Sequence, residues 1–128
     1  MSKDEALYQS LAACGAMLIA FIGVCHEVIG GLVFPWAPVM LGPIGWHALG
    51  LSAIVLGSLT LAGTLKLIRF PVVPFALLAV TLGVAIGVLT AILHREFHMF
   101  AFAGAAAGAV TAVFHGKADV RVEPASVR

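Results

Sequence analysis

The chain has 128 residues, of which 62% are apolar and 10% are charged, and its formal net charge is +1. Soluble domains are about 45–50% apolar and about 25% charged, so this composition excludes a soluble enzyme on a membrane anchor and a disordered chain. The near-neutral charge, without a basic stripe, argues against a nucleic-acid partner. We therefore expect a membrane protein whose first partner is the lipid bilayer.

Four apolar segments are each about as long as the 20 residues that a transmembrane helix needs. They cover residues 11–34, 44–68, 72–93 and 98–114. Ser2 and Glu5 have capping-box spacing, so the first helix is expected to begin before the membrane. Residues 35–43 contain three prolines and predict a tight loop.

The expected fold class is an all-α antiparallel bundle of four transmembrane helices with short loops. Residues 1–115 form its single domain, and residues 116–128 are a polar tail too short to fold alone.

The basic residues indicate an orientation for this bundle. Arg95 falls on one side of a four-span arrangement, and six basic residues fall on the other: Lys3, Lys66, Arg69, Lys117, Arg121 and Arg128. By the positive-inside rule, both termini are expected in the cytoplasm, with the protein in the inner (plasma) membrane of the cell. Trp36 and Trp46 are then expected at the outer boundary and Tyr8 at the inner one, as interfacial aromatic residues.

Small residues recur at helical spacing in three of the spans. The stripes are Gly15, Gly23, His26 and Gly30 in the first span, Ala76, Gly83, Gly87, Thr90 and His94 in the third, and Gly104, Gly108, Thr111 and His115 in the fourth. Small residues let helix backbones approach closely in lipid. These stripes therefore predict helix-packing faces, within the chain or against other membrane subunits.

An ionisable residue inside a membrane span is a candidate functional residue because burying it is costly. His26 and Glu27 lie in the first span, and His47 opens the second on the expected outer side, where His94 and His98 also lie. Imidazole and carboxylate groups suit a transition metal or a proton relay. We take these five residues as a candidate metal or proton site, although their spacing matches no dedicated metal motif such as H-E-x-x-H.

Three functions fit these features. The first is an accessory or structural subunit of a larger or homo-oligomeric membrane complex, with His26 and Glu27 as a polar clamp between helices. The second is a small transporter or channel that handles protons or metal cations through the same two residues. The third is a redox subunit that binds haem b or a quinone, since haem needs two histidines at similar depth. No serine has a partner base at a recognisable spacing, which argues against a hydrolase.

Overall fold

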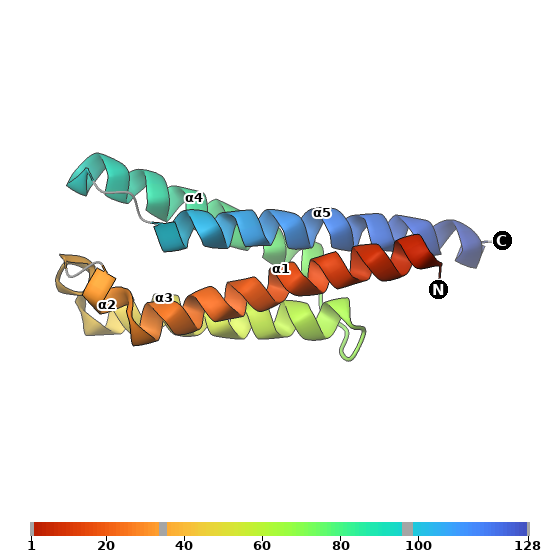
Figure 1. Ribbon diagram of the computed structural model, residues 1–128, viewed down its shortest axis with the longest axis horizontal. Helices are drawn as coiled ribbons and strands as arrows, with labels where there is room; N and C mark the ends of the chain where they lie inside the picture. Colours follow the sequence, from red (N-terminus) through yellow and green to blue (C-terminus); the bar gives the residue numbers. More distant parts are fainter. Residues whose placement is uncertain (1, 34–35, 96–98, 128) are drawn as a thin grey trace.

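The computed structural model describes residues 2–33, 36–95 and 99–127, and every element in this part of the chain is a helix (Figure 1). The helices are α1 (Lys3–Val28), α2 (Gly30–Val33), α3 (Trp36–Thr64), α4 (Val72–His94) and α5 (Met99–Val127). Four stretches are long and apolar enough to cross a bilayer: Lys3–Val28, Gly42–Thr64, Val72–Leu93 and Met99–Ala118. The expected all-α fold with four spans is confirmed, and these helices make the chain a multi-pass membrane protein.

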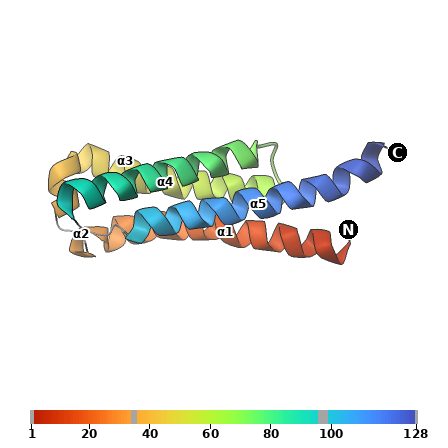
Figure 2. The same cartoon turned by 90° about the horizontal axis from the view of Figure 1, so that it is seen from above.

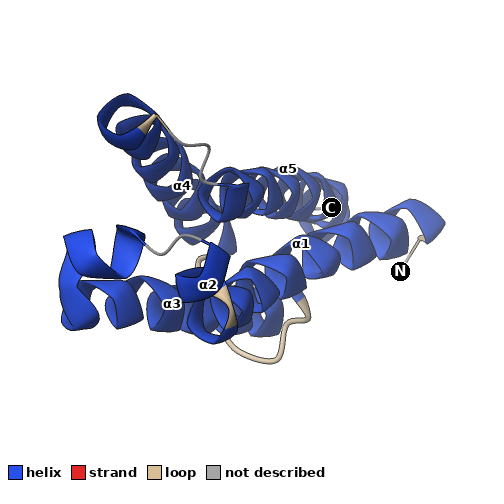
Figure 3. Ribbon diagram, turned by 60° about the vertical axis from the view of Figure 1, so that its left-hand side comes forward, coloured by secondary structure: helices blue, strands red, loops and turns tan. Residues whose placement is uncertain are grey.

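Helix α1 is the centre of the bundle, because it packs along both α3 and α5. Helix α4 packs mainly on α5 and touches α3 much less. Helices α3 and α4 diverge from each other, as Figures 1 and 3 show. Both termini and the connection 65–71 lie at one end of the bundle, and α2 and the end of α4 lie at the other (Figures 1 and 2). We call the first of these the N/C end.

Glycines of all three small-residue stripes lie at helix contacts, as the sequence predicts, except Gly104, which has no atom within 4 Å of a Cβ built there. A Cβ atom at Gly15 would come within 2.9 Å of the Ala107 carbonyl on α5, and one at Gly23 within 2.8 Å of the Gly50 carbonyl on α3. On the other side of the bundle, a Cβ at Gly108 would lie 2.8 Å from the Ala76 carbonyl. The backbones therefore approach more closely than any side chain would allow.

The start of α1 agrees with the capping signal in the sequence, whereas both boundaries of the second span differ from those predicted. Helix α1 begins at Lys3 because the Ser2 hydroxyl accepts a hydrogen bond from the Glu5 amide at 3.1 Å, as the capping spacing suggests. Residues 36–41, expected in a loop, are helical, and the chain breaks instead at Gly42, whose φ is 74°. Helix α3 stops at Thr64, not at residue 68, because Lys66 adopts a left-handed conformation.

Helix α5 is longer than the span predicted for it. It continues to Val127, so the backbone of residues 116–127, expected as a tail, is helical. Extending a formed helix costs much less than starting a new one, and this explains how a polar segment can continue the apolar helix.

Candidate functional site

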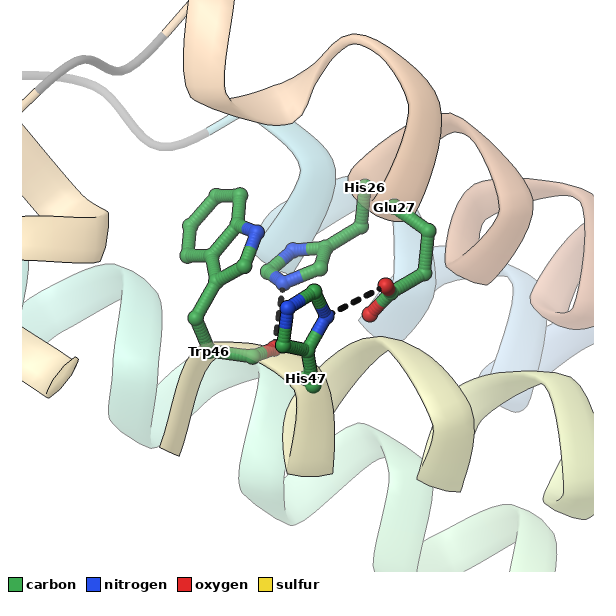
Figure 4. Close-up of polar contacts among 4 residues, drawn as sticks. All are labelled: His26, Glu27, Trp46 and His47. Atoms are coloured by element: carbon green, nitrogen blue, oxygen red, sulfur yellow. Dashed lines mark hydrogen bonds and ion pairs between the residues drawn. The ribbon is translucent and has the colours of Figure 1, made fainter. Parts of the chain in front are cut away.

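A hydrogen bond to the backbone of α3 anchors His26, at the end of α1 (Figure 4). The His26 Nε2 atom lies 2.8 Å from the carbonyl oxygen of Trp46. A carbonyl oxygen can only accept, so Nε2 carries the proton and donates it. The backbone of one helix is thereby joined to a side chain of its neighbour.

The His26 ring also stacks on the Trp46 indole. The ring centroids are 3.7 Å apart with an angle of 26° between the planes, and both residues are buried. Gly30 makes room for the indole, since a Cβ there would lie 2.8 Å from Trp46 Cζ2. Trp46 is therefore packed inside the bundle, about one helical turn from the start of the span Gly42–Thr64.

Glu27 makes the second polar link between the same two helices. Its Oε2 atom lies 2.7 Å from Nδ1 of His47, whose side chain is 58% exposed, against 20% for Glu27. The other carboxylate oxygen, Oε1, is buried and has no hydrogen-bond partner in the described part of the chain. The pair thus connects an exposed imidazole to a largely buried carboxylate.

Gly50 shapes this site although it contributes no polar atom. A Cβ atom at this position would overlap Oε1 of Glu27 and would lie 2.7 Å from Cδ2 of His26. Neither Gly50 nor the Trp46 carbonyl can be recognised as part of the site from the sequence. In the sequence, both residues are marked only by lying within one helical turn of His47. This proximity becomes informative only when the register of α1 against α3 is known.

The structure brings together three of the five candidate residues, namely His26, Glu27 and His47. His98 lies outside the described residues, and His94 ends α4 with its side chain outside the description. Among the residues described, no three His, Cys, Asp or Glu side chains gather as a metal site would require. In this arrangement His26 could give Nε2 to a metal or a haem iron only by losing its bond to Trp46.

An apolar cavity of about 150 Å³ lies beside His26, where α3 and α4 diverge. All four long helices contribute to its wall, and small residues form much of it: Gly23, Gly50, Ala53, Ala79, Gly83 and Gly104. We call this region the α3/α4 seam. It is half-open, so the bundle is not closed on this side.

Comparison of the chain with protein-family models, with curated proteins and with solved structures found no match. Chemically, the site offers a buried imidazole that holds a carbonyl and a carboxylate that holds a second imidazole. Such groups can fix two helices together, and the second pair can also take up and release a proton.

Proposed function

We propose that the protein is a structural subunit of a membrane complex. The observation that carries this proposal is that His26 and Glu27 are both bonded to α3 of their own chain. Interhelical hydrogen bonds in a bilayer stabilise a helix pair by about 0.6 kcal/mol each on average. Joining α1 to α3 is therefore enough to explain why His26 and Glu27 are present in a membrane span, where burying them costs free energy. It is also the polar clamp between helices that the sequence suggests.

The open α3/α4 seam supports assembly with a neighbouring subunit. Small side chains form much of its wall, beside larger apolar ones such as Ile19 and Leu82, and small residues favour close approach of another helix. We infer that a transmembrane helix from a neighbouring subunit packs against this seam. The N/C end would face the cytoplasm, with the protein in the inner membrane. Lys3 begins α1 and the 65–71 connection holds two further basic residues at this end, whereas Arg95 follows α4 at the other end.

Native mass spectrometry of the tagged protein, extracted from its own membrane in mild detergent, tests this proposal. We expect assemblies heavier than the 13.2 kDa chain, as multiples of that mass or with a second protein in fixed ratio. Ala53→Phe would fill the seam and should dissociate the assembly. Val55→Phe is the matched control, since Val55 is 56% exposed and does not line the seam. A chain that stays monomeric, or equal loss in both variants, would contradict the proposal.

A second candidate function, proton handling, is favoured by one observation. The buried Oε1 of Glu27 has no partner in the described part of the chain, while Oε2 contacts the exposed His47. Proton flux into liposomes that contain the purified protein tests it. Flux that is lost in Glu27→Gln and kept in Glu5→Gln would support this function, whereas flux no faster than that of empty liposomes would exclude it.

A further inference from the structure

A second hollow lies at the N/C end, far along the bundle from His26. It has a volume of about 470 Å³ and lies between the 65–71 connection and α5. Of the seven described residues that line it, three can carry positive charge, namely Lys66, Arg69 and His115, and none of the seven is acidic. The hollow therefore has the electrostatic character of an anion site.

The two permanent cations of the hollow, Lys66 and Arg69, form no ion pair with any side chain that the structure describes. Among the side chains that the structure describes, no carboxylate lies within 4.0 Å of Lys66 or Arg69. Helix α4 begins directly after this connection, and Pro71 offers no side-chain hydrogen bond to its free amide groups. The positive end of the helix dipole thus adds to the attraction for an anion.

The turn that presents these cations has a defined shape. The Leu67 amide donates to the Ala62 carbonyl at 2.9 Å and the Lys66 amide to the Gly63 carbonyl at 3.1 Å, which is a Schellman motif. Two apolar side chains, Leu67 and Ile68, are 73% and 44% exposed between the two cations. Two apolar residues between two cations fit a segment that places its apolar side chains in lipid and its charges at the level of the headgroups.

We propose that this hollow binds the phosphate group of an anionic lipid headgroup, with Lys66 and Arg69 as its cationic ligands and His115 as its wall on α5. A soluble phosphate ester would offer the same chemistry. The exposed Leu67 and Ile68 favour a lipid, because they would lie along its acyl chains.

Native mass spectrometry of the full chain in detergent, titrated with phosphatidylglycerol or with phosphatidylcholine, tests the site. The variants are Lys66→Asn, Arg69→Gln and the control Arg95→Asn. Lys66 and Arg95 are matched, since both are left-handed residues at a helix end, with φ of 62° and 56°, and asparagine tolerates that conformation. We expect each of the first two variants to lower the preference for phosphatidylglycerol about fivefold, and the control to leave it unchanged.

Two results would overturn the proposal. One is an equal loss in Arg95→Asn, which would show general attraction to the charged chain. The other is an unchanged preference in the double variant Lys66→Asn/Arg69→Gln, with its helical circular dichroism intact. Inorganic phosphate, added at rising concentration, separates the two sources. Displacement of the lipid at millimolar phosphate supports a phosphate site that soluble esters also fill, and retention supports a lipid site.

Discussion

Gly50 on α3 lies against the side chains of His26 and Glu27 on α1. His26 and Glu27 can be found from the sequence because ionisable residues stand out in an apolar segment, and His47 follows from the expected orientation. Gly50 and the Trp46 carbonyl cannot, since their role depends on how α1 is registered against α3. The side chains of the site are thus predictable, whereas the space and the backbone acceptor that complete it are not.

Alanine at position 50 should destabilise the site. Its Cβ would displace the carboxylate of Glu27 or the ring of His26, and overpacking of this kind costs about 1–3 kcal/mol. Gly104→Ala is the control, because no atom lies within 4 Å of a Cβ built there. Unfolding in detergent, followed by circular dichroism, should show a loss of stability in Gly50→Ala alone. Equal stability of the two variants would show that the site relaxes at no cost.

The two histidines of the site should contribute unequally to stability. His26→Ala removes a buried hydrogen bond and a stacked ring, for an expected loss of roughly 2 kcal/mol. His47→Ala removes a mostly exposed partner, for an expected loss of less than about 1 kcal/mol. The same unfolding measurement compares them, and a larger loss in His47→Ala would place the main clamp at Glu27 instead of His26.

Among the elements, the spans are easier to predict than their ends. Length and hydropathy are sufficient for four helices, because lipid forces each apolar segment to satisfy its own backbone hydrogen bonds. The end of α3 is not predictable in this way. Leu65, Leu67 and Ile68 are apolar enough to extend the span, yet the chain turns at Lys66.

Lys66→Gly should stabilise the turn after α3. Lysine in the left-handed region costs roughly 1–2 kcal/mol relative to an ordinary helical conformation, and glycine avoids that cost. Glycine also gains freedom in the unfolded chain, so the net gain should be about 1 kcal/mol or less. Unfolding in detergent measures it, with Lys117→Gly, inside α5, as a control that should lose stability. Destabilisation by Lys66→Gly would mean that the lysine side chain has a structural role of its own.

For the whole molecule, the order of contacts α3–α1–α5–α4 leaves one seam open. The sequence identifies the packing faces but not which faces meet, since each stripe of small residues could serve any neighbour. The sequence does predict the placement of the basic residues: Lys3 at the start of α1 and Arg69 in the 65–71 connection share one end of the bundle, and Arg95, directly after α4, lies at the other.

Cysteine labelling in sealed vesicles tests this placement. With Cys14 and Cys25 replaced by alanine, Lys3→Cys and Arg69→Cys should react with a membrane-impermeant maleimide from the same side. Arg95→Cys should react from the opposite side, and detergent should make all three reactive. Labelling of Arg69→Cys and Arg95→Cys from one side would show that α4 does not cross the membrane.

The central position of α1 also determines the order in which its contacts form during biosynthesis. Helix α3 follows α1 closely in the sequence, so His26 and Glu27 find their partners early in synthesis. Gly15 can pack only after Ala107, on the last helix, has been made. At about 5–20 residues per second, Gly15 stays uncovered for on the order of ten seconds. A chain truncated before α5 would carry a completed polar link between α1 and α3 and an uncovered Gly15. Membrane quality control could use that combination to distinguish an unfinished chain from a finished one.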